Sequence, residues 1–107
     1  MTFDDVVRAA LDELPPALAQ ALVNVAVIIE DENPDDPDLF GLYHGVPLPD
    51  RSHDFAGLPD RITIFRRPLE RACRTRAQLR REIQVTVVHE IAHFFGIDDE
   101  RVRELGY

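Results

Sequence analysis

The chain alternates between segments with apolar residues at helical spacing and short apolar runs typical of strands. Residues 3–14 carry apolar side chains three and four positions apart, which predicts an amphipathic helix with Thr2 as its N-cap. Prolines follow at positions 15 and 16. Proline cannot continue a helix but suits the first turn of the next one, so a second short helix is predicted over 16–23.

Three short segments have the composition of β-strands. Residues 25–29 form a continuous apolar run rich in β-branched side chains, which predicts a central strand buried on both faces. Residues 39–44 and 61–66 predict two further short strands. Between the first two lies the segment 30–38, with six acidic residues and two prolines. Because its spacing fits no EF-hand pattern, we expect a solvated acidic loop there rather than a calcium site.

The last third of the chain is predicted to be helical. A short helix is expected from Pro68 to Cys73, followed by a long helix over 76–95 that Gly96 ends. A terminal helix over 98–105 follows, with Asp98 as its N-cap.

Together these elements predict one α+β domain over residues 1–107. Its architecture would be a small mixed three-stranded sheet packed against helices, with a long surface loop over 46–60. The net charge of −8 argues against nucleic acid as a partner, because phosphate binding needs a basic surface. The single Cys73, the acidic N-terminus and the lack of an apolar run of about 18 residues favour a cytoplasmic protein that does not enter a membrane.

The chemistry of the chain is concentrated in the second half of the long helix. His89 and Glu90 begin the pattern H-E-x-x-H-x-x-G-x-x-D, which His93 continues and Asp99 completes. Residues four apart share one helix face, so both imidazoles can reach a single zinc ion. Glu90 flanks that ion without having to bind it, and can act as the catalytic carboxylate.

The surroundings of the motif support a cleft beside this helix. Val and Ile cover most of the remaining circumference, so the helix is expected to be buried. Polar side chains in one stripe of a buried helix need partners or a cavity. Glu82 and Thr86 share the stripe and could orient the metal ligands. The stripe consists of Glu82, Thr86, His89, Glu90 and His93.

The third ligand is expected just after the helix ends. Gly96 can adopt a left-handed conformation and turn the chain back toward the ion. Asp99 is the position that the motif spacing favours, with the neighbouring acids Asp98 and Glu100 as alternatives.

On these residues the chain resembles a family of minimal bacterial zincin-like metallopeptidases. The resemblance lies in residues 41–48, 58–69 and 86–101, and extends over nearly the whole chain. It implies a metallopeptidase with a small sheet backed by helices, without naming a substrate. Two features depart from larger zincin relatives. The only methionine is Met1, so the methionine turn beneath the zinc is missing, and few residues follow Asp99 to build the floor of a cleft. A protein partner could complete that cleft.

Two tyrosines and two further histidines are also potential site residues. Tyr43 or Tyr107 could polarise a substrate carbonyl group, or could be ordinary packing residues. His44 and His53 are expected at the surface, because neither has a partner at ligand spacing.

The favoured function is a zinc peptidase in which Glu90 is the general base for a zinc-activated water. Its peptide or protein substrate would pair with the sheet edge at 39–44 rather than with 62–65. A zinc-stabilised adaptor domain without turnover is the alternative, and a zinc hydrolase acting on RNA is disfavoured by the net acidity.

Overall fold

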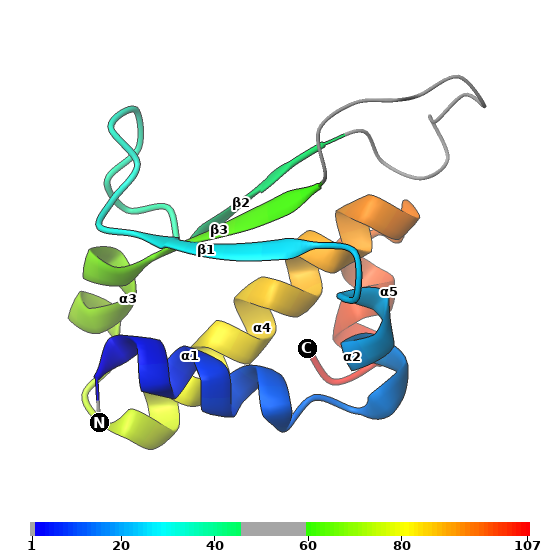
Figure 1. The fold of residues 1–107 in the computed structure, drawn as a ribbon, viewed down its shortest axis with the longest axis horizontal. Coiled ribbons are helices and arrows are strands. Elements are labelled where there is room, and N and C mark those ends of the chain that lie inside the picture. Colours follow the sequence, from blue (N-terminus) through cyan, green and yellow to red (C-terminus); the bar gives the residue numbers. More distant parts are fainter. Residues whose placement is uncertain (1, 46–59) are drawn as a thin grey trace.

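The computed structural model describes residues 2–45 and 60–107, and Figure 1 shows how their helices and strands are arranged. The predicted loop over 46–60 lies, apart from Asp60, outside the described residues. In chain order the elements are α1 (Phe3–Asp12), α2 (Pro16–Ala21), β1 (Ala26–Glu30), β2 (Gly41–His44), β3 (Arg61–Phe65), α3 (Arg66–Ala72), α4 (Arg76–Phe95) and α5 (Asp99–Glu104).

The three strands form a mixed sheet in the order β1-β3-β2, which confirms the predicted α+β class. β1 runs parallel to β3, and β2 runs antiparallel to it. The register places Ile29 opposite Ile64 on one side of β3, and Gly41 opposite the same Ile64 on the other side.

The prediction that residues 25–29 form the central strand is wrong. β1 is an edge strand in which exposed and half-buried residues alternate. The central strand is β3, where every residue from Ile62 to Phe65 is buried. The polar Thr63 interrupts the apolar pattern of β3 in the sequence, yet only 3% of its surface is exposed because strands flank it on both sides. The unbroken apolar run at residues 25–29 therefore belongs to β1, which is less buried than β3.

The core lies between the sheet and the helices on one of its sides. α4 crosses this side diagonally and α1 packs against α4 (Figure 1). Burial of their apolar faces is what holds the helices to the sheet. The buried apolar residues of this core are Val6, Val7, Ala10, Leu14, Ile62, Ile64, Leu69, Ile83, Val87, Val88, Ile91, Ala92 and Val102.

Helix ends match the local signals of the sequence. Thr2 caps α1 through its hydroxyl oxygen, which accepts the N–H of Asp5. Gly96 ends α4 in the left-handed region with φ of 71°. The N–H groups of Gly96 and Ile97 donate to the carbonyls of His93 and Ala92, the paired bonds of a Schellman motif. α5 can therefore begin close to the end of α4.

The acidic loop between β1 and β2 is mostly exposed, as predicted, and two of its carboxylates pair with arginines of α3. Arg66 pairs with Asp31 at 2.6 Å, and Arg71 pairs with Asp38 at 3.4 Å. The Arg66 guanidinium lowers the pKa of the Asp31 carboxyl below its usual value. These exposed pairs fix the path of the loop, which returns to the sheet beside α4, but each contributes little to stability.

The part of the chain described by the structure contains no helix long and apolar enough to cross a membrane.

Candidate metal centre

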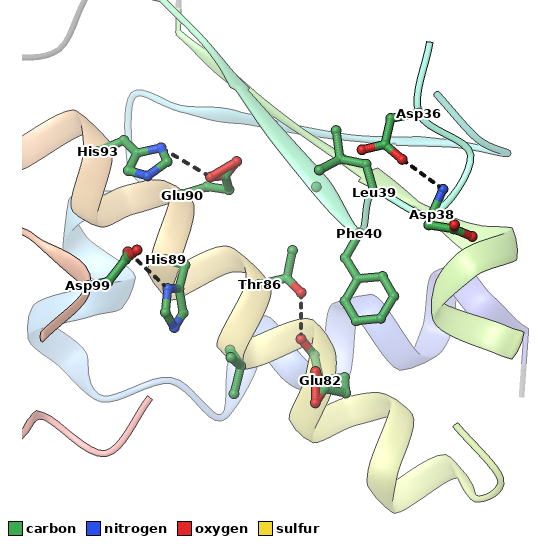
Figure 2. A pocket seen from close by; sticks show the side chains of 12 residues that line it. Asp36, Asp38, Leu39, Phe40, Glu82, Thr86, His89, Glu90, His93 and Asp99 are labelled. Atoms are coloured by element: carbon green, nitrogen blue, oxygen red, sulfur yellow. Dashed lines mark hydrogen bonds and ion pairs between the residues drawn. The ribbon is translucent and has the colours of Figure 1, made fainter. Parts of the chain in front are cut away.

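A cavity of about 540 Å³ lies between α4 and the segment that leads into β2. All five polar residues of the predicted stripe on α4 line it. Facing them are side chains from the end of the acidic loop, and Asp99 closes one end (Figure 2). The remaining lining residues are Asp36, Asp38, Leu39, Phe40, Gly41 and Val85. The expected cleft beside the motif helix is therefore present.

Local geometry explains why the four motif residues share this cavity. His89, Glu90 and His93 lie on one side of α4 because the helix repeats every 3.6 residues. The turn at Gly96 reverses the chain, and Asp99, the first residue of α5, comes to lie beside His89 (Figure 2). Asp98 caps α5 by accepting the N–H of Arg101 at 2.9 Å, which leaves Asp99 as the neighbour of the histidine.

His89 is held between two oxygen atoms. Its Nε2 lies 2.9 Å from the main-chain oxygen of Tyr107, and its Nδ1 lies 3.5 Å from Oδ1 of Asp99. Two donor atoms on one tetrahedral zinc ion, at bond lengths of about 2.0–2.2 Å, are about 3.4 Å apart. The His89–Asp99 pair therefore fits a shared zinc ion in both donor type and separation.

Glu90 is the buried carboxylate of the site, with 8% of its surface exposed. Its Oε1 accepts the main-chain N–H of Tyr43 at 3.1 Å, and its Oε2 lies 3.3 Å from Nδ1 of His93. Burial raises the pKa of the Glu90 carboxyl above its usual value, although His93 and the Tyr43 N–H oppose the shift. A carboxylate with a raised pKa is better matched to accepting a proton near neutral pH.

The motif side chains form two pairs rather than one cluster. His89 faces Asp99, whereas His93 faces Glu90 and is half exposed. Within residues 2–45 and 60–107 no group of three or more potential ligand side chains converges closely enough to hold a metal ion.

The two residues expected to orient the ligands, Glu82 and Thr86, make no hydrogen bond to the described histidines. The Thr86 hydroxyl donates to the carbonyl of Glu82 at 2.8 Å, a bond within α4 itself. Main-chain groups contact the motif side chains instead: the N–H of Tyr43 donates to Glu90, and the main-chain oxygen of Tyr107 faces His89. Sequence analysis missed both contacts, because every residue carries these groups and only the fold selects them.

The two tyrosines and two other histidines lie away from the cavity or outside the described residues. Neither tyrosine side chain lines the cavity, and the Tyr43 hydroxyl is buried. The Tyr107 ring packs against the guanidinium of Arg81. His44 is half-buried on β2 and lines a different cavity on the other face of the sheet, and His53 is outside the described residues.

A mixed sheet whose edge strand runs beside a helix carrying His-Glu-x-x-His is the arrangement of a zincin-type domain. The model of the zincin-like metallopeptidase family matches residues 22–107, and the chain belongs to that family. None of the curated proteins compared with the chain matches it.

Proposed function

We propose that this protein is a zinc-dependent peptidase in which His89, His93 and Asp99 hold the metal and Glu90 is the general base. The observation that carries the proposal is the cavity that α4 and the start of α5 line with these four side chains. The 3.5 Å approach of His89 to Asp99, a residue beyond the helix end, supports Asp99 as the third ligand.

A bound zinc ion would supply Lewis acidity, which polarises a peptide carbonyl and makes water a better nucleophile. The protein itself supplies the proton transfer. Glu90 would accept a proton from the attacking water and pass it to the leaving amine. The Tyr43 N–H holds Oε1 of this carboxylate, and Oε2 lies beside His93.

The substrate chain would lie along β2. This strand is an edge of the sheet, whereas β3 is paired on both sides and has no free edge, which supports β2 over the alternative at 62–65. The N–H of Phe65 donates to the carbonyl of Phe40, so alternation along an antiparallel pair turns the main-chain groups of Gly41 and Tyr43 away from β3. A peptide added to this edge would compete with Glu90 for the Tyr43 N–H.

The test is a paired digestion of a broad peptide library by the parent and by Glu90→Gln, with zinc content measured for both. Glutamine keeps the size and hydrogen bonding of glutamate but cannot accept a proton at neutral pH. We expect one zinc per chain in both proteins, and a loss of cleavage of about 10²–10⁴-fold in the variant. Equal cleavage by the two proteins would exclude Glu90 as the base.

A second variant, Asp99→Ala, tests the ligand set. We expect weaker zinc binding, with Glu100→Ala as the matched control because Glu100 is exposed and lies outside the cavity. If the parent holds zinc but cleaves nothing in the library, alone or with candidate protein partners, the zinc-stabilised adaptor becomes the better hypothesis.

A further inference from the structure

The cavity that contains the motif residues continues along α4 beyond them. Glu82 lines the same cavity, about 10 Å before His89 along the helix axis at a rise of about 1.5 Å per residue. Figure 2 shows His93 and Glu82 at opposite ends of the row of α4 side chains that face the cavity. One end of the cavity is therefore too far from the motif to belong to the metal centre.

This end, which we call the distal subsite, consists of Leu39, Phe40, Glu82 and Val85. Three of its four side chains are apolar, and all four are half-buried. Among the residues that the structure describes, no arginine lines any part of the cavity. The distal subsite thus has apolar walls and one carboxylate, and no cation from the described chain neutralises it.

Glu82 differs from the two other acids beside this subsite. The Asp38 carboxylate pairs with Arg71 at 3.4 Å, and Oδ1 of Asp36 accepts the main-chain N–H of Asp38 at 3.2 Å. Within residues 2–45 and 60–107, the carboxylate of Glu82 has no hydrogen bond or ion pair, and only its main-chain carbonyl is bonded, to Thr86. A half-buried carboxylate of this kind is ready to accept a cationic group from a ligand.

Arginine and lysine side chains match both properties of the distal subsite. Each has an aliphatic stem that packs along apolar surface and a cationic head at its end. The stem would lie against Leu39, Phe40 and Val85 while the head reaches Glu82. An acidic side chain would be repelled there, and an apolar one would cover the carboxylate without pairing with it.

The direction of β2 decides which part of a substrate reaches this subsite. Gly41 lies against Thr86, where an added β-carbon would be 2.5 Å from Cγ2, and the Tyr43 N–H binds Glu90 one turn further along α4. β2 therefore runs toward the metal centre. Antiparallel pairing is the more common and slightly more stable arrangement, so a peptide added to β2 would run from the metal centre toward Glu82.

We propose that Glu82 makes this protein selective for peptides with an arginine or lysine within three residues after the scissile bond. The inference rests on the proposed peptidase function and names its substrate class. Three residues of an extended chain span about 10 Å, which equals the separation of Glu82 from His89 along α4. Glu82 binds the substrate and takes no part in the proton transfer.

The first experiment measures peptide binding to the metal-free protein, which requires no turnover. Fluorescence anisotropy compares three pools of labelled peptides that are random except for one fixed arginine, norleucine or glutamate. We expect the parent to bind the arginine pool about 10-fold more tightly than the norleucine pool, near the lower end for a hydrogen bond between charged groups. Glu82→Gln should bind these two pools equally, and Glu82→Lys should prefer the glutamate pool.

The matched control is Glu13→Gln, which removes the same charge from an exposed residue that pairs with Arg80 outside the cavity. It should keep the preference for arginine. Melting temperatures are measured for every variant, and Glu82→Gln, which keeps the size of the side chain, tests the inference even if Glu82→Lys does not fold. Equal binding of all pools by the parent, no binding of any pool, or a preference that survives in Glu82→Gln would each overturn the inference.

The second experiment digests a peptide library with the zinc-loaded parent and with Glu82→Gln, and identifies the cleaved bonds by mass spectrometry. Arginine and lysine should be enriched about 10-fold in the three positions after the cleaved bond for the parent, and not for Glu82→Gln. Enrichment only before the cleaved bond would overturn the predicted direction of the substrate.

The two proposals fail in different ways. Cleavage by the parent without any preference for basic residues would overturn the role of Glu82 and leave the peptidase proposal standing. Binding that depends on Glu82 as expected, in a zinc-loaded parent that cleaves no peptide, would support the distal subsite and remove the peptidase proposal.

Discussion

The close approach of Gly41 on β2 to the motif helix predicts a strong effect of Gly41→Ala. Gly41 lies on β2 where this strand crosses α4, and a β-carbon added there would be 2.5 Å from Cγ2 of Thr86 and 3.3 Å from the carbonyl oxygen of Thr63. Carbon atoms normally pack about 3.5–4.0 Å apart, so β2 and α4 would have to separate by about 1 Å. The backbone of Gly41 is not in the left-handed region, and the cost therefore comes from packing alone.

The expected loss of stability is about 2 kcal/mol, within the range for overpacked cores. For a domain of this size that lowers the melting temperature by roughly 8–16 °C. Thr86→Ser removes the clashing methyl group but keeps the hydroxyl that donates to Glu82. By itself it should cost about 0.8 kcal/mol, the value of one buried methyl group.

The assay is urea and thermal unfolding of four metal-free proteins: the parent, the two single variants and the double variant. In the Thr86→Ser background, Gly41→Ala should cost less than about 1 kcal/mol, since only the milder contact with Thr63 remains. An equal cost in both backgrounds would refute the argument that contact with Thr86 is the cause.

Three further outcomes are expected. Burial raises the pKa of the Glu90 carboxyl, so its charged form is disfavoured in the folded state. Metal-free Glu90→Gln should therefore melt at the same temperature as the parent or higher at neutral pH. A clearly lower melting temperature would contradict this. Gly96→Ala should destabilise the fold by about 1–2 kcal/mol because φ is 71°, whereas Gly96→Asn should lose less; chemical denaturation compares the two. Zinc at 100 times its dissociation constant should add about 2.7 kcal/mol to the unfolding free energy of the parent, and a chelator should reverse the gain. If calorimetry shows no change in melting temperature with zinc, binding specific to the folded state is excluded.

Local sequence was sufficient for most helices and their ends. The sequence predicted α4 where the structure has it, at Arg76–Phe95, and Thr2, Gly96 and Asp98 marked helix ends. These signals are local, because a cap or a turn depends on atoms within four residues along the chain. For the same reason, the spacing of His89, Glu90 and His93 was enough to predict that they share one face.

Strand order was decided only by tertiary structure. Residues 25–29 have the apolar composition of a buried strand, yet β1 lies at an edge because β3 pairs with both other strands. Pairing depends on partners far apart in the sequence, and the burial of Thr63 in the middle of β3 follows from its neighbours and not from its own side chain.

The chain's sequence by itself was enough to predict which residues could carry the chemistry and that one helix aligns three of them. Only the tertiary structure decided what surrounds them. It brings Asp99 to His89 around the turn at Gly96, and it directs the main-chain groups of Tyr43 and Tyr107 at Glu90 and His89. The physical reason is that almost every residue carries the same main-chain donor and acceptor. No pattern of side chains therefore shows which of these main-chain groups the folded chain will place against the site.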